Sequence, residues 1–309
     1  MAEQHIPVLL NEVIEGLNIK PDGIYVDLTL GRGGHSEQIL KRLSPKGLLI
    51  GVDQDETAIK ESSERLSKVS SNYKIIRSNF ENVDQILKEL GIEKVDGVLM
   101  DLGVSSPQFD NPERGFSYRY DSPLDMRMDQ RNTLTAAKIV NEYSERELFE
   151  IFRDYGEEKY AYSIAKNIVK YRLTKKIETT FELVDIIKKS KPSKELKKVG
   201  HPAKQAFQAL RIAVNDELDV LKTALEKVTN CLAPKGRLAV ITFHSGEDKI
   251  VKQFFKKLTV IEGNRYDLPI KEKETDYVLI THKAIVPSEE ELEVNHRSAS
   301  SKLRIIEAK

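Results

Sequence analysis

Short apolar runs alternate with helical patterns over the first hundred residues of the chain. Four such runs, bounded by turn-forming or polar residues, predict strands over residues 24–29, 48–53, 73–77 and 95–102. Strands that alternate with helices predict βαβ units and therefore a parallel sheet. A parallel sheet is covered on both faces, which explains why these strands are apolar throughout rather than alternating. The first part of the chain is accordingly predicted to be α/β.

A long interruption follows the fourth predicted strand, because the next convincing strand covers residues 238–243. A crossover between parallel strands needs only about a dozen residues, whereas 135 residues, from 103 to 237, lie between these two strands. The excess predicts an inserted module. Helical patterns fill it at 135–154, 157–172 and 179–189, and two late apolar runs at 277–281 and 303–306 bring the predicted strands to seven.

A long amphipathic helix is predicted over residues 203–231. Apolar residues recur there at steps of four or three, which gives one apolar stripe that can lie on the sheet; they are Leu210, Val214, Leu218, Leu221, Leu225 and Val228. We assign this helix to the core. The predicted organisation is an α/β core of residues 1–105 and 206–309, with an inserted helical domain at 106–205.

Charge and composition narrow the class of protein without identifying a partner. The 309 residues include 49 basic and 49 acidic side chains, so any nucleic-acid surface must be a local patch. No apolar run approaches the roughly 18 residues of a membrane span, and the N-terminus lacks the basic and apolar regions of a secretion signal. The single cysteine, Cys231, excludes an internal disulfide and a thiolate zinc cluster. We expect a soluble, cytoplasmic protein with no membrane segment.

The first predicted strand leads into a glycine-rich turn, Asp-Leu-Thr-Leu-Gly-Arg-Gly-Gly-His-Ser, at residues 27–36. Glycines at this point let the backbone approach a ligand closely. The dinucleotide fingerprint requires a third glycine where this chain has Ser36. Asp27 precedes Gly31 by four residues, as in the D-x-x-x-G-x-G pattern of methyltransferases, and an acidic residue suits the cationic cofactor S-adenosylmethionine. A tight turn with a solvated aspartate is the structural alternative.

Two further residues follow predicted strands at positions where a nucleoside can bind. Asp53 ends the second strand, where its carboxylate can accept hydrogen bonds from ribose hydroxyls. Phe80 follows the third strand, and its ring can pack on an adenine face or belong to the core.

The fourth predicted strand leads into Asp-Leu-Gly-Val-Ser-Ser-Pro-Gln at residues 101–108. Ligands of open parallel sheets bind beyond the carboxyl ends of the strands, so Asp101 and Gln108 are predicted to lie at the crevice. Asp101, with carbonyl groups near Gly103 or Pro107, can hold the hydrogens of an exocyclic amine and orient its lone pair toward a methyl donor. The chain lacks the Pro-Pro-aromatic sequence that many amino-methyltransferases have after this acidic residue.

Candidate substrate residues lie beyond the fourth and fifth strands. Arg114, Phe116 and Arg127 belong to segments in which aromatic and arginine side chains suit stacking on an unpaired base; a folded loop with paired charges is an equal alternative. His244 follows the fifth strand and can orient a substrate or move a proton, or can be a hydrogen-bonded structural histidine. The six histidines show no ligand spacing, so we expect no metal site.

A basic segment lies within the predicted insertion. Residues 166–204 contain eleven lysines and one arginine against four acidic residues. Such a segment can contact phosphates, or it can form a solvated helix face.

Several long motifs in one order resemble the RsmH (MraW) family, whose members methylate the N4 amine of a cytidine in 16S ribosomal RNA. The resemblance covers nearly the whole chain. It rests on HIPVLL at 5–10, the turn at 31–36, the segment 101–108, RGFS at 114–117, PLDMRMD at 123–129, YGEE at 155–158 and FQALRI at 207–212.

The resemblance implies S-adenosylmethionine as cofactor and an inserted helical domain that recognises substrate. The cofactor contacts it implies are Gly33, Gly34, His35, Asp53, Phe80, Asp101 and Gln108. The implied substrate is 16S rRNA of the assembled small subunit near the decoding centre, in bacterial cytoplasm. Departures from the family pattern lie at Gly246, Lys249, His296, Ala299 and Ser301.

A second class of function remains open. A non-catalytic RNA-binding assembly factor would keep the cofactor pocket only for stability, and a dehydrogenase is a weaker alternative because Ser36 replaces the third glycine. The sequence leaves open the group that takes the amine proton and the oligomeric state, a homodimer included.

Overall fold

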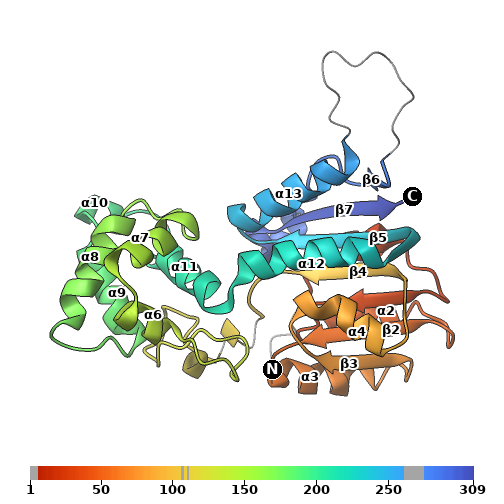
Figure 1. Ribbon diagram of the computed structural model, residues 1–309, viewed down its shortest axis with the longest axis horizontal. Helices are drawn as coiled ribbons and strands as arrows, with labels where there is room; N and C mark the ends of the chain where they lie inside the picture. The colour runs from red at the N-terminus through yellow and green to blue at the C-terminus, as the bar shows by residue number, and fades with distance from the viewer. Residues whose placement is uncertain (1–5, 106–107, 110, 261–274) are drawn as a thin grey trace, which may run out of the picture. The chain divides into compact units, whose positions relative to one another are not determined.

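The described residues of the computed structural model, 6–105, 108–109, 111–260 and 275–309, form two compact units (Figure 1). The first unit comprises the chain up to Gly103 and again from Leu218 onward. The second unit is the segment Val104–Glu217. The two units have separate hydrophobic cores.

The first unit contains one seven-stranded sheet with the strand order β3-β2-β1-β4-β5-β7-β6. Its strands are β1 Ile24–Asp27, β2 Leu48–Asp53, β3 Tyr73–Arg77, β4 Val95–Asp101, β5 Leu232–Thr242, β6 Tyr277–Leu279 and β7 Lys302–Ala308. The first five strands are parallel, and β7 pairs antiparallel with both β5 and β6. The predicted α/β class and the seven strands are confirmed.

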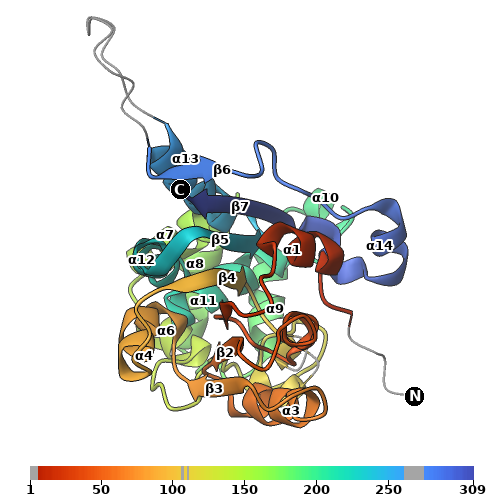
Figure 2. The same ribbon diagram turned by 90° about the vertical axis from the view of Figure 1, so that its right-hand side faces the viewer.

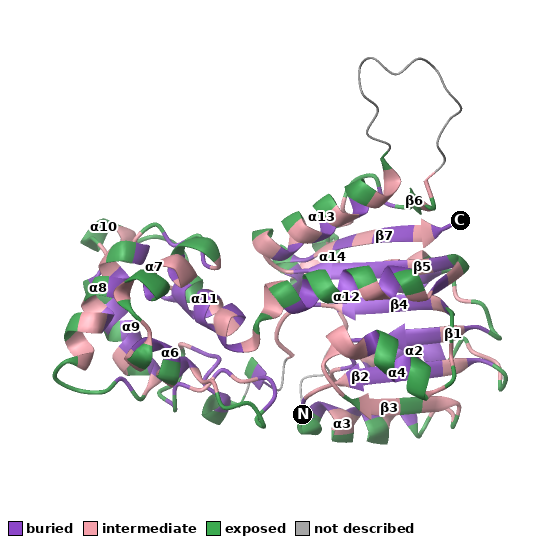
Figure 3. Cartoon of the chain, viewed as in Figure 1, coloured by how far each residue is buried: buried purple, intermediate pink, exposed green. Residues whose placement is uncertain are grey.

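Helices cover both faces of this sheet (Figures 1 and 2). One face packs against α4 (Val83–Glu89), α12 (Glu217–Cys231) and α13 (Ser245–Thr259). The other face packs against α1 (Leu10–Leu17), α2 (Gly34–Leu40) and α3 (Glu56–Leu66). Because apolar helices lie on both sides, the central strands are buried almost throughout, as the purple segments of Figure 3 show. A short helix, α14 (Glu289–Val294), precedes β7.

The second unit is helical and has one core. Its longer helices are α6 Ala136–Glu142, α7 Glu145–Asp154, α8 Ala161–Arg172, α9 Thr180–Lys189 and α11 Lys204–Asn215, with the single turn α10 Ser193–Leu196. Capping boxes start two of them: Ser144 with Glu147 begins α7, and Thr179 with Glu182 begins α9. These caps satisfy the first backbone N–H groups of each helix and fix where it begins.

The prediction of a single helix over residues 203–231 is wrong, because the structure has two helices there, α11 and α12. Asp216 adopts a left-handed conformation (φ 51°, ψ 36°) that ends α11, and its N–H donates to the carbonyl of Ile212. Leu210 and Val214 are buried in the core of the second unit, whereas Leu221 packs on the sheet of the first. The junction between the units therefore follows Glu217, and not residue 205 as the sequence suggested.

No helix among the described residues is both long enough and apolar enough to cross a membrane.

The backbone around Gly115 in the second unit leaves no room for a side chain, which can be tested by substitution. Gly115 has φ 69°, and a Cβ there would lie 2.3 Å from the carbonyl oxygen of Pro123 and 2.7 Å from the N of Asp125. Both neighbours are backbone atoms that cannot rotate away. Gly91 has φ 70° with nothing within 4 Å of its Cβ position, so it is a matched control for the backbone conformation alone.

We predict that Gly115→Ala lowers the free energy of unfolding by at least about 3 kcal/mol, whereas Gly91→Ala costs about 1–2 kcal/mol. Urea unfolding followed by circular dichroism measures both. Equal losses for the two variants would show that the backbone at Pro123 yields to the added methyl group.

Candidate functional site

Three neighbouring strands of the first unit end in an aspartate. Asp27 ends β1, Asp53 ends β2 and Asp101 ends β4. These strands are parallel and adjacent, so their carboxyl ends lie at one edge of the sheet. That edge is where ligands of open α/β sheets bind.

Asp53 holds the glycine-rich turn in place. Its Oδ2 accepts a hydrogen bond of 2.9 Å from the N–H of Gly31, and its Oδ1 accepts one of 2.9 Å from the N–H of Asp55. Gly33 has φ 73° and forms the N-cap of α2. At Gly34 a Cβ would lie 2.5 Å from Cγ of Pro7, so the missing side chain lets the N-terminal segment cross the start of α2.

Thr29 and Ser36, whose contacts sequence reasoning did not predict, form hydrogen bonds with the aspartates of β1 and β4. Ser36 Oγ donates to Asp27 Oδ2 over 2.8 Å, and Thr29 N–H donates to Asp27 Oδ1 over 3.1 Å. Thr29 Oγ1 accepts the N–H of Asp101 over 2.6 Å. The usable signal was the replacement of a third glycine by Ser36, which supplies a donor next to a buried carboxylate.

His35 lies in the first turn of α2, and its ring faces Asp101 at the end of β4. The His35 ring is buried, with Nε2 lying 2.8 Å from the carbonyl oxygen of Val8 and Nδ1 lying 3.7 Å from Asp101 Oδ2. Asp101 Oδ1 is buried and has no hydrogen-bond partner among the described residues. A buried acceptor in this state calls for a donor, which a bound ligand can supply.

Burial is the largest cause of the pKa shifts of the titratable side chains at this edge. It raises the pKa of both Asp27 and Asp53 to about 6, against the hydrogen bonds that favour their charged forms. Burial, followed by the carboxylates of Asp27 and Glu247, raises the pKa of Asp101 well above its ordinary value. Burial also lowers the pKa of His35 to about 4. The edge therefore favours a positively charged ligand, which would offset the repulsion between carboxylates.

The remaining predicted cofactor residues lie in different surroundings. Phe80 begins a short 3-10 helix, Phe80–Asn82, after β3, and its half-buried ring packs against the core beneath α4 and α12. Gln108 belongs to the second unit, where its side chain is buried and its Oε1 accepts the N–H of Ser105 over 3.2 Å. Ser106 and Pro107 lie outside the described residues. The structure thus brings Gly33, Gly34, His35, Asp53 and Asp101 to one edge of the first unit.

Two of the predicted substrate residues point into the second unit. Arg114 is buried, and its Nη2 donates to the carbonyl oxygens of Arg127 (3.0 Å) and Met128 (3.1 Å). Phe116 is 4% exposed and belongs to the core of that unit. Their side chains stabilise the loop that carries them, and stacking on a base would require this packing to open.

Arg127 is also engaged within its own loop. Its guanidinium forms an ion pair with Asp125 (Nη2 to Oδ2, 2.7 Å), while Nη1 donates to the carbonyl oxygens of Gln130 and Asn132. Such a bidentate pair fixes both side chains.

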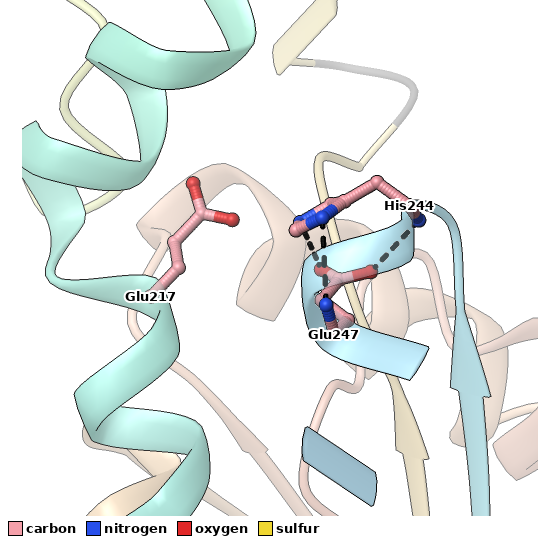
Figure 4. Close-up of side chains that lie close together, drawn as sticks. All are labelled: Glu217, His244 and Glu247. Atoms are coloured by element: carbon pink, nitrogen blue, oxygen red, sulfur yellow. Dashed lines mark hydrogen bonds and ion pairs between the residues drawn. The ribbon is translucent and has the colours of Figure 1, made fainter. Parts of the chain in front are cut away.

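His244 is the N-cap of α13 (Figure 4). Its Nδ1 accepts the N–H of Glu247 over 3.4 Å, while Glu247 Oε2 accepts the N–H of Phe243 over 2.7 Å. His244 Nε2 lies 3.2 Å from Glu247 Oε1. This reciprocal cap is a structural role for His244, and it places Glu247 near the carboxyl end of β5. Figure 4 also draws Glu217, the first residue of α12.

Comparison with known proteins gives matches over the whole chain. Residues 2–309 match the model of the MraW methylase family. The ribosomal RNA small subunit methyltransferase H of Mesoplasma florum is 57% identical, over 99% of this chain and 100% of the relative. The enzyme of that name from Clostridioides difficile is 53% identical over 99% of each chain. Among solved structures, an rRNA methylase from Streptococcus thermophilus is similar with a TM-score of 0.43 at 13% identity, covering 97% of this chain and 93% of that one.

The pKa of Asp53 predicts a pH dependence of stability. Because the folded protein raises this pKa from 3.8 to about 6, the stabilising contribution of the protonated carboxyl is complete below about pH 3.8 and is lost as the pH rises through about 6. Asp53→Asn removes this titration. From pH 4 to pH 7.5, the free energy of unfolding of the variant should therefore gain up to about 3 kcal/mol relative to that of the natural chain.

Urea unfolding at several pH values without added ligand measures this difference. Parallel pH profiles for the two proteins would contradict the assigned ionisation of Asp53.

Proposed function

The chain belongs to the MraW methylase family, and we propose that it transfers a methyl group from S-adenosylmethionine to the N4 amine of a cytidine in small-subunit ribosomal RNA. As a member of this family it is a methyltransferase. The RNA substrate is supported by the names of two relatives that share more than half of their residues with it. We place the target cytidine in 16S rRNA near the decoding centre, and the enzyme in the bacterial cytoplasm.

The observation that carries the proposal is the row of aspartates at the ends of β1, β2 and β4 beside the glycine-rich turn. A methyl donor with a sulfonium and an ammonium group offsets the repulsion among these carboxylates. The buried Oδ1 of Asp101 lacks a partner among the described residues, so it suits a donor of the ligand. The residues present therefore fit the cofactor.

Each residue of the edge has a separate task in binding. Asp53 already fixes Gly31, and its remaining lone pairs accept hydrogen bonds from ribose hydroxyls. Gly33 supplies the positive φ that starts α2, and Gly34 leaves room for Pro7, so both glycines shape the turn beside the ligand. Phe80 follows β3, and we propose that its ring packs on the adenine.

Asp101 is the proposed catalytic residue. The lone pair of a cytosine amine is delocalised into the ring, which makes the amine a poor nucleophile. A carboxylate that accepts one amine hydrogen turns the lone pair toward the methyl group and supports the positive charge that develops on nitrogen. The donor supplies the methyl group in an in-line displacement, and the chain contributes positioning and charge.

The second unit is proposed to recognise the RNA. The basic segment 166–204 lies on α8, α9, α10 and the start of α11. Lysines at its surface include Lys166, Lys170, Lys188, Lys189, Lys194 and Lys197. We propose that these exposed lysines contact the phosphate backbone, which would make the affinity depend on salt.

The decisive test is nucleoside mass spectrometry of small-subunit rRNA from cells with and without this gene. We expect loss of an N4-methylated cytidine in the deletion and its return with the natural chain. Asp101→Ala should fail to restore it, because the carboxylate that orients the amine is gone. Asp219→Ala, at an exposed position of α12, is the control and should restore the modification in full.

An unchanged modification profile, with the gene expressed in the parent strain, would refute the proposed substrate. Purified protein that binds the RNA but transfers no methyl group would favour the non-catalytic assembly factor instead.

A further inference from the structure

The tautomer of the neutral His35 ring is fixed by the backbone of the N-terminal segment. The carbonyl of Val8 can only accept, so His35 Nε2, at 2.8 Å, carries the hydrogen. The neutral ring then presents a bare lone pair at Nδ1. Residues near α14 hold this segment in place: Leu9 N–H donates to Glu291 Oε1 (2.9 Å), and Asn295 Nδ2 donates to the carbonyl of Ile6 (3.1 Å).

The lone pair of His35 Nδ1 faces a carboxylate oxygen. Asp101 Oδ2 lies 3.7 Å away, and an ionised carboxylate would set two acceptors against each other. The other charged groups that act on Asp101 are also carboxylates, Asp27 on β1 and Glu247 on α13. One proton between His35 and Asp101 removes the repulsion. It resides on the carboxyl group, because burial lowers the pKa of His35 to about 4 and raises that of Asp101 well above its ordinary value.

A cation beside Asp101 and His35 changes which protonation state of the carboxyl group is favoured. Positive charge within a few ångströms of a carboxyl group favours the ionised form and lowers its pKa. A ligand that brings a sulfonium and an ammonium group to this edge therefore displaces a proton as it binds. Loss of the sulfonium charge during the reaction restores the original preference for the protonated form.

We propose that Asp101 carries a proton beside His35 in the free enzyme, that it releases this proton when S-adenosylmethionine binds, and that it then takes up the proton that the methylated amine must lose. This inference rests on the proposed function. His35 acts through Asp101 and is a positioning residue. It is fixed by Val8 and directs its Nδ1 toward the oxygen that carries the proton.

The proposed step is balanced. The carbon–sulfur bond breaks and its electron pair stays on sulfur, while the amine lone pair forms the new nitrogen–carbon bond. The methylated nitrogen is then cationic. Its N–H bond breaks, the electron pair stays on nitrogen, and the proton passes to Asp101 Oδ2 beside His35 Nδ1. Departure of the neutral sulfide product leaves the pair protonated, as it was before the donor bound.

Isothermal titration calorimetry tests the first half of this cycle without turnover. Titrating the full-length protein with S-adenosylmethionine at pH 7.5, in buffers of different ionisation enthalpy, gives the number of protons released. We expect about one proton for the natural chain. At this pH the carboxyls of Asp27 and Asp53, with pKa values of about 6, are already ionised and contribute little. S-adenosylhomocysteine, which lacks the sulfonium charge, should release fewer.

Variants of Asp101 and His35 test whether the released proton comes from Asp101. Asp101→Asn should bind the donor with no proton release. His35→Asn keeps an acceptor near the position of Nδ1 and should retain the pH profile of release. His35→Gln keeps a donor toward Val8 but has no acceptor facing Asp101, so its profile should move to lower pH by roughly one unit. Difference infrared spectroscopy of the natural chain should also show a protonated carboxyl band that disappears when the donor binds, and this measurement needs no variant.

The outcomes separate the inference from the function on which it rests. Donor binding without proton release, unchanged release in folded Asp101→Asn, or identical profiles for the two His35 variants would overturn the proposed proton on Asp101 and leave the methyltransferase assignment intact. Failure of the natural chain to bind S-adenosylmethionine would instead overturn the proposed function.

Discussion

Burial of several carboxylates at one edge of the sheet is the constraint on which the site depends. Parallel pairing of β1, β2 and β4 brings Asp27, Asp53 and Asp101 to the same edge, and helices on both faces keep water from surrounding them. Backbone N–H groups donate to both Asp27 and Asp53, and the hydroxyl of Ser36 donates to Asp27, without neutralising either carboxylate. The folded protein therefore contains buried carboxylates that repel one another. A cationic ligand would reduce this repulsion, and the reduction would contribute to the binding free energy.

The inserted unit does not interrupt the sheet that carries the buried carboxylates. β4 and β5 pair in parallel although the whole of Val104–Glu217 lies between them in the chain. The insertion has its own core and its own capped helices, so its folding does not draw apolar residues from the sheet. The sequence of this unit, which we propose to recognise the RNA, can accordingly change without altering the sheet edge that carries the three aspartates.

The aspartates at the strand ends were predictable because each follows an apolar run whose burial defines a strand. His35 was selected through the family resemblance, and its partner was not predictable. Val8 lies 27 residues earlier and contributes a backbone carbonyl, which leaves no signal in a sequence. The end of α11 at Asp216 was missed because no glycine or proline marks it; aspartate tolerates the left-handed conformation. For Arg114 and Phe116 the sequence left base stacking and a folded loop as equal alternatives, because a loop motif does not reveal which side chains fold inward.

The contact of Leu9 with Glu291 has a consequence for the order in which the enzyme is made. The carbonyl that orients His35 belongs to a segment held by residues near α14, and β7, which lies between β5 and β6, follows that helix. During synthesis, the glycine-rich turn and all three aspartates emerge from the ribosome long before Glu291 does. A nascent chain can thus build the first four strands early, yet the carboxyl group of Asp101 acquires its fixed neighbour, His35, only when translation is nearly finished.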